Sequence, residues 1–160
     1  MKSVSHEKLA VTGMGILSAL GTGWEATCRA LLNGYSPIGK IRHLQTIHAG
    51  LPCAEVSYTD DEMKTILGVG DLPAFNRTTL MGMIACREAW LTAAIPPAWA
   101  ASQRIVFING TTVGGMDKSE RYYEDFCGND SKNDYIATHE CGVCTETIAD
   151  TSGIPFDYVT

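Results

Sequence analysis

Leu9-Ala10-Val11-Thr12-Gly13-Met14-Gly15-Ile16-Leu17-Ser18-Ala19-Leu20-Gly21 is the stretch that decides the fold of this 160-residue chain. Its apolar residues 9–12 predict a buried strand, and the two glycines that follow predict the turn that ends it. Residues 24–33 then show a helical pattern, with Trp24, Cys28, Leu31 and Leu32 on one apolar face and Gly34 as the stop. The chain therefore opens as strand, glycine turn and helix.

The rest of the chain continues this alternation. Residues 104–109 contain the continuous apolar run Ile105-Val106-Phe107-Ile108, β-branched and aromatic, which indicates a parallel strand covered on both faces. Strands that alternate with helices predict one α/β domain over residues 1–160, a layered αβα arrangement with a mostly parallel sheet. The other expected elements are strands at 53–58 and 156–160 and helices at 60–67 (capped by Asp60), 77–94 (capped by Asn76), 116–126 and 145–151.

Composition excludes several classes of protein. A hydrophobic fraction of 45% and a charged fraction of 19% are typical of a globular chain rather than a disordered one. The net charge of −6 argues against a nucleic-acid partner, which needs a basic face. No apolar run approaches the ~20 residues of a membrane span, and the first residues lack the apolar core of a signal peptide. We expect a cytoplasmic protein whose six scattered cysteines are reduced.

The first glycine turn could be a dinucleotide site, because Gly13 and Gly15 match the start of G-x-G-x-x-G. Ser18 stands at the third glycine, however, and Asn33 and Gly34 occupy the place of the ribose-binding acid. The alternative is a tight strand-to-helix turn with no ligand. We therefore predict no bound cofactor.

Further motifs occur in order along the chain. They are Val11-Thr12-Gly13-Met14-Gly15, Leu31-Leu32-Asn33-Gly34, Asn76-Arg77-Thr78 and the strand with its glycine turn at 105–115. In order and spacing they resemble the N-terminal half of the β-ketoacyl-acyl-carrier-protein synthases, the condensing enzymes of fatty-acid and polyketide synthesis. Asn76 departs from the family pattern, which has Asp there. The resemblance covers nearly the whole chain but only the N-terminal part of the family.

The resemblance implies a thiolase-like fold of two similar α/β halves and a dimer of such subunits. It also implies a Cys nucleophile at a helix N-terminus and two histidines that assist decarboxylation of the malonyl unit. The family's Thr-Ala-Cys-Ser-type segment would begin just after Thr160, so no catalytic residue is assigned within the chain. Alone, the chain is expected to be inactive in the decarboxylative Claisen condensation.

Two explanations follow from that position of the nucleophile. The favoured one is a piece of a longer synthase, because residues 158–160 look like the middle of a strand. The other is a short non-catalytic protein, or a partner subunit similar to a chain-length factor. The partners implied by the family are acyl carrier protein, acyl and malonyl thioesters, and a second synthase subunit in a homodimer or heterodimer. A half-fold is also expected to self-associate through an exposed apolar face.

Four residues are acyl-pocket candidates by resemblance. Val113 matches a branched residue that lies beside the acyl chain, and Thr112 stands where the family has glycine. Tyr135 and Ile136 fall where the family reaches into the pocket of the partner subunit. The alternatives are core packing for Val113 and loop packing for Tyr135 and Ile136.

Cys141 and Cys144 form one CxxC pair with His139 nearby. A structural zinc site needs four ligands, usually two such pairs. A redox pair would open a helix after a thioredoxin-like strand, which the polar loop before Cys141 does not provide. We predict neither metal nor redox use.

Overall fold

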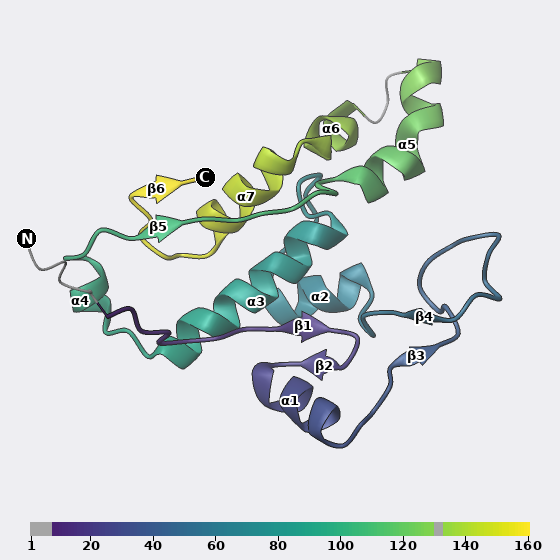
Figure 1. The fold of residues 1–160 in the computed structure, drawn as a ribbon. Helices are drawn as coiled ribbons and strands as arrows, with labels where there is room; N and C mark the ends of the chain where they lie inside the picture. The colour runs from purple at the N-terminus through teal and green to yellow at the C-terminus, as the bar shows by residue number, and fades with distance from the viewer. Residues whose placement is uncertain (1–7, 130–132) are drawn as a thin grey trace, which may run out of the picture.

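The computed structural model describes residues 8–129 and 133–160 (Figure 1). Its helices are α1 (Trp24–Leu32), α2 (Asp60–Leu67), α3 (Arg77–Ala93), α4 (Pro97–Ala100), α5 (Met116–Asn129), α6 (Asn133–Ile136), the 3-10 turn η1 (Ala137–His139) and α7 (Cys141–Thr151). Its strands are β1 (Leu17–Ser18), β2 (Gly21–Thr22), β3 (Ile38–Gly39), β4 (Cys53–Ala54), β5 (Val106–Phe107) and β6 (Tyr158–Val159).

The long helix α3 lies at the centre, with α2 and α7 packed against it (Figure 1). Asn76 caps it as predicted, because its side-chain oxygen accepts a 2.9 Å hydrogen bond from the backbone N–H of Thr79. Leu80, Met83 and Ile84 on one face of α3 are buried, as the helical period requires, whereas Leu91 near the end of the helix is 68% exposed. The core cluster consists of Met63, Phe75, Leu80, Met83, Ile84, Cys144 and Ile148.

Strand β5 pairs in parallel with β6, and α5, α6, η1 and α7 form the connection between them. Val106 lies opposite Tyr158 and Phe107 opposite Val159. A helical crossover between parallel strands is the signature of an α/β fold, so the predicted class is confirmed. The pairs β1–β2 and β3–β4 are antiparallel, so the described residues form two antiparallel pairs and one parallel pair where a mostly parallel sheet was predicted.

Two strand predictions were wrong in their burial. Residues 9–12 are not a buried strand, since Leu9 is 98% exposed and Val11 82% exposed. Strand β5 is covered on one face only, because Val106 and Ile108 are 49% and 76% exposed. Residues 9–12 belong to no sheet in the described structure, and no described element covers the outer face of β5, so the apolar side chains of both stay exposed.

Helix α1 forms where predicted and stops at Gly34, whose φ of +65° is the left-handed geometry of a helix end. Its apolar face is largely exposed: Leu31 is 61% and Leu32 88% accessible, and of its nine residues Thr27 is the buried one. Amphipathic spacing therefore shows where a helix forms, but not whether a partner covers it.

Two helix starts also differ from the prediction. Thr59, not Asp60, caps α2, because its hydroxyl accepts from the Glu62 N–H while the Glu62 carboxylate accepts from the Thr59 N–H. This reciprocal capping box needs an acid three positions after the cap, which Asp60 does not have. Helix α7 begins at Cys141 rather than at Thr145.

Candidate functional site

The candidate cofactor turn packs directly on α3. A Cβ atom added at Gly13 would meet the carbonyl of Ala89, and one added at Gly15 would meet the carbonyl of Ala85. Thr92 fixes the segment between them, since its hydroxyl hydrogen bonds with both the N–H and the C=O of Met14 at 3.0 Å. The two glycines therefore allow close approach of the backbone to a helix, which explains them without a phosphate ligand.

The second glycine turn carries Thr112 and Val113. The hydroxyl of Thr111 accepts from the N–H of Val113 at 3.3 Å, and Gly114 takes a φ of +48°. The N–H of Gly115 donates to the carbonyl of His139 at 3.2 Å. The turn is thus held on η1, while Thr112 and Val113 lie exposed at the start of α5, with Val113 47% accessible.

Close packing explains the glycines of this turn as well. A Cβ at Gly114 would meet the His139 carbonyl, and one at Gly115 would meet the Thr138 carbonyl. No residue with a Cβ atom fits at two consecutive positions that lie this close to backbone carbonyls. The turn and η1 are therefore locked together through backbone atoms.

The other two candidates, Tyr135 and Ile136, lie at the end of α6 and are half-buried. The Tyr135 ring packs on Tyr122 of α5 with centroids 4.6 Å apart. The Lys118 ammonium lies 5.8 Å from the Tyr135 ring centroid. The hydroxyl of Thr138 donates to the Tyr135 carbonyl at 2.8 Å. Tyr135 is therefore fixed by both α5 and η1.

The structure brings these two pairs of candidates into one neighbourhood. Helix α5 follows directly from the Val113 turn and contacts both α6 and η1. Thr112 and Val113 lie at one end of this unit, and Tyr135 and Ile136 lie on the helix packed beside it. The contacts place the four residues on one substructure, and their role in binding an acyl chain stays a prediction.

Arg77, in the Asn76-Arg77-Thr78 motif, connects several parts of the chain through hydrogen bonds. The Arg77 guanidinium donates to the carbonyl of Tyr58 and to the Asp60 carboxylate, each at 3.0 Å, and to the carbonyl of Val56 at 3.2 Å. Its backbone N–H donates to Asp117 of α5 at 3.3 Å. Arg77 thus ties the start of α3 to α2 and α5.

Cys144 packs in the core and His139 contacts α5, whereas Cys141 is exposed. The His139 Nδ1 atom lies 2.8 Å from the hydroxyl of Ser119, which joins η1 to α5. Cys144 is buried in the core, whereas Cys141 is exposed at the first position of α7. Across residues 8–129 and 133–160, no three His, Cys, Asp or Glu side chains are grouped as a metal ion requires.

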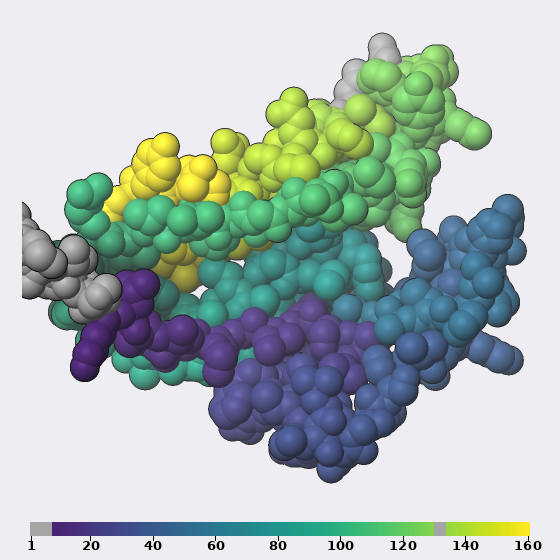
Figure 2. Space-filling view, in the orientation of Figure 1, coloured from purple at the N-terminus to yellow at the C-terminus, as the bar shows by residue number. Residues whose placement is uncertain are grey.

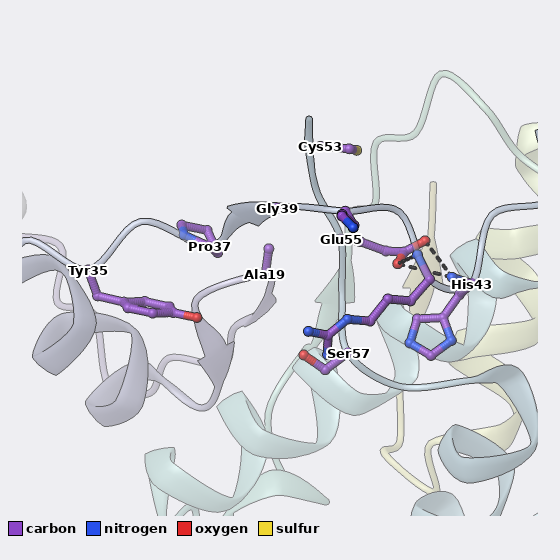
Figure 3. A pocket seen from close by; sticks show the side chains of 10 residues that line it. Ala19, Tyr35, Pro37, Gly39, His43, Cys53, Glu55 and Ser57 are labelled. Carbon is purple, nitrogen blue, oxygen red and sulfur yellow. Dashed lines mark hydrogen bonds between the residues drawn. The ribbon is translucent and has the colours of Figure 1, made fainter. Parts of the chain in front are cut away.

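A small polar cavity of about 100 Å³ lies beside the β3–β4 pair (Figure 3). Its lining includes Glu55, whose carboxylate accepts backbone N–H bonds from Arg42, His43 and Leu44 at 2.8–3.1 Å. Burial raises the pKa of Glu55, but these hydrogen bonds outweigh it and hold the pKa below its usual range. The Glu55 carboxylate already accepts hydrogen bonds from the backbone of residues 42–44. We therefore assign no catalytic or binding role to the cavity.

The sequence pattern did not reveal the role of Glu55, nor that of Glu88, whose carboxylate accepts hydrogen bonds from the backbone N–H groups of Ile16 and Trp24. Each is a single acid that binds backbone N–H groups outside its own helix or strand, and no local motif marks such a residue. A larger apolar groove of about 500 Å³ was missed too. It lies between segments that are ninety residues apart in sequence, such as those of Gly15 and Ile105.

No protein-family model and no curated protein matches this chain. The solved structure of the ishigamide ketosynthase/chain length factor is similar in fold, with a TM-score of 0.77 and 22% sequence identity. The similarity covers 94% of this chain and 38% of that one. The chain has the thiolase-like fold of the ketosynthases. It spans well under half the length of that ketosynthase/chain length factor chain.

In the described ranges, no helix is long and apolar enough to cross a membrane.

Proposed function

We propose that this chain is the N-terminal domain of a ketosynthase-type subunit that acts in polyketide or fatty-acid synthesis. The observation that carries the proposal is the fold similarity over 94% of the chain. The ordered motifs of residues 11–15, 31–34, 76–78 and 105–115 support the same assignment from sequence. Acyl carrier protein, acyl and malonyl thioesters and a second subunit are the partners that this role requires.

The chain contributes scaffold and part of an acyl pocket to the condensation. Val113 and Thr112 are exposed on a turn held by backbone contacts, and Tyr135, the neighbour of Ile136, is held on α5 and η1. A turn fixed by backbone contacts suits the wall of an acyl pocket, because the width of the pocket sets which acyl chains fit. In this proposal, the nucleophilic cysteine and the two histidines of the reaction are supplied by polypeptide outside these 160 residues.

A chain-length-factor-like partner is the second candidate, since the similar structure is a ketosynthase/chain length factor. The nucleotide sequence after the Thr160 codon separates the two. A frame continuing into Thr-Ala-Cys supports the synthase, and another residue at the Cys position supports the partner. A stop codon directly after Thr160 contradicts both and leaves a short standalone protein.

The enzymatic test uses the full reading frame and this chain side by side, each with acyl- and malonyl-carrier protein. We expect condensation by the full synthase and none by the 160-residue chain. Val113→Trp in the full protein should shorten the longest product by narrowing the pocket, with Glu146→Gln on the exposed side of α7 as the matched control. Turnover by the 160-residue chain alone would overturn the claim that its nucleophile lies elsewhere.

A further inference from the structure

Three polar side chains at the junction of α3 and α5 each keep one buried atom without a hydrogen-bond partner among the described residues. The atoms are Asn76 Nδ2, Thr79 Oγ1 and Asp117 Oδ1. Asn76 and Thr79 are fully buried. Buried polar groups in folded proteins nearly always have a partner, because an unpaired group loses its hydration and gains nothing in return. Each of the three atoms therefore needs a partner.

Hydrogen bonds of the same side chains place these atoms around the first turn of α3. The Oδ1 atom of Asn76 accepts from the Thr79 N–H at 2.9 Å. The Oδ2 atom of Asp117 accepts from the N–H of Arg77 at 3.3 Å, and Arg77 directly follows Asn76. In Figure 2, the green atoms of α5 adjoin the teal atoms at one end of α3. The three unpaired atoms thus belong to side chains that are already gathered at one helix start.

The chemistry of the three atoms identifies the molecule that fits between them. The amide nitrogen of Asn76 can only donate, the ionised Asp117 carboxylate can only accept, and the Thr79 hydroxyl can do either. A metal cation would face the Asn76 N–H groups, and an anion would face Asp117. The Asn76 amide cannot turn round, because its oxygen accepts from Thr79. A water molecule both donates and accepts, and buried water typically makes about three hydrogen bonds to otherwise unpaired groups.

We propose that the junction of α3 and α5 holds one buried water molecule, which accepts from Asn76 Nδ2, donates to Asp117 Oδ1 and has the Thr79 hydroxyl as its third partner. The site also gives a reason for Asn76, which stands where the resemblance to the synthases places Asp. A carboxylate there would offer no N–H and would add a second negative charge beside Asp117. The water joins the cap of α3 to the helix that follows the Val113 turn. The inference rests on these buried atoms and not on the proposed reaction.

Thr79→Val in the full 160-residue chain tests the water by the sign of its effect. Valine has nearly the shape of threonine, so the change removes the hydroxyl and little else. If the hydroxyl bonds to water, its removal should lower the urea midpoint of unfolding by roughly 0.5 M. Removal of a buried hydroxyl that has no partner should instead raise the midpoint. A raised midpoint therefore overturns the proposal.

Thr78→Val is the matched control, because Thr78 lies one position earlier in α3 and is half-buried. It should leave the urea midpoint within about 0.2 M of the native value. An equal loss in both variants would mean that valine weakens the helix generally, and it would overturn the assignment of a water partner to Thr79.

An exchange of residues between positions 76 and 117 tests the donor and the acceptor together. Asn76→Asp leaves two carboxylates at the site and Asp117→Asn leaves two amides, so each should lower the urea midpoint. The double exchange restores one amide and one carboxylate, and it should regain about half or more of the summed loss. Losses that simply add overturn the proposal, because they show that the two side chains do not share a site.

A crystal structure of the chain that resolves ordered water locates the molecule directly. We expect one water oxygen at about 2.7–3.2 Å from each of Asn76 Nδ2, Thr79 Oγ1 and Asp117 Oδ1. A direct bond between Asn76 Nδ2 and Asp117 Oδ1 with no water between them overturns the proposal, and a metal ion at the site does so too.

Discussion

The carboxylate of Glu88 in α3 accepts a 2.8 Å hydrogen bond from the backbone N–H of Ile16, 72 positions earlier in the chain. Its second oxygen accepts from the N–H of Trp24 at 3.0 Å, the first residue of α1. One acid on the central helix therefore fixes both the end of the N-terminal segment and the start of the first helix. A negative charge at that helix start is also favourable to the helix dipole.

Glu88→Ala should remove both bonds and lower the free energy of unfolding by about 2–3 kcal/mol, because hydrogen bonds to charged groups are the strong ones. Urea unfolding measures the loss, and faster amide exchange at Ile16 and Trp24 locates it. Exposed Glu146→Ala is the matched control and should change little. Unchanged exchange at Ile16 and Trp24 would contradict the role of Glu88.

Gly15→Ala should destabilise the chain by about 1–3 kcal/mol, because its methyl group would overlap the Ala85 carbonyl and push the N-terminal segment off α3. Gly142→Ala is the contrast, since nothing lies near a Cβ at that position in α7. Alanine there should stabilise by about 0.5–1 kcal/mol through helix propensity. Thermal unfolding of the two variants checks the opposite signs.

The Glu55 bonds predict a pH effect. The pKa of Glu55 in the folded chain is lower than its ordinary value, because backbone N–H bonds outweigh burial. The stabilisation is therefore complete above about pH 4.3 and is lost as the pH falls through the lower folded value. Glu55→Gln should be less stable than the native chain at pH 7, and the difference should shrink below pH 4. A difference that is constant from pH 7 to pH 3 would show that the charge is not involved.

The two cysteines of the CxxC pair should respond differently to substitution. Cys144 is 1% exposed within the core, so Cys144→Ser buries a hydroxyl and should cost about 1–3 kcal/mol. Cys141→Ser changes an exposed side chain and should stay within about 0.5 kcal/mol. Unfolding with and without zinc is the measurement, and a zinc-dependent loss shared by both variants would point to a metal site instead.

Replacing a leucine by alanine should lower the free energy of unfolding more in the core than at the surface. Leu80 of α3 is fully buried, so Leu80→Ala should cost about 2–5 kcal/mol by leaving a cavity. Leu32 is 88% exposed on α1, and Leu32→Ala should cost less than about 0.5 kcal/mol. Denaturant unfolding compares them, and a large cost at Leu32 would mean that a partner covers α1 in solution.

Local signals in the sequence were sufficient for the α/β class and for α1, α2, α3 and α5, whereas the short helices α4 and α6 were not predicted. Asn76 and the apolar period after it predicted α3, and the apolar run at 104–109 predicted the strand β5. Each signal is contained within a few residues, since a helix or strand is decided by neighbours three or four positions apart. The ordered motifs likewise predicted the fold that this chain shares with the ketosynthase/chain length factor structure.

Only the tertiary structure decided which of these surfaces are covered. Residues 9–12 and the outer face of β5 were predicted to be buried because they are apolar, yet they are exposed, because no other part of the described chain covers them. The roles of Gly13, Gly15, Glu55 and Glu88 were also hidden, because each depends on a backbone group brought near by folding. Sequence pattern records which side chains prefer burial, whereas burial itself requires a second surface, and that surface is set by long-range packing.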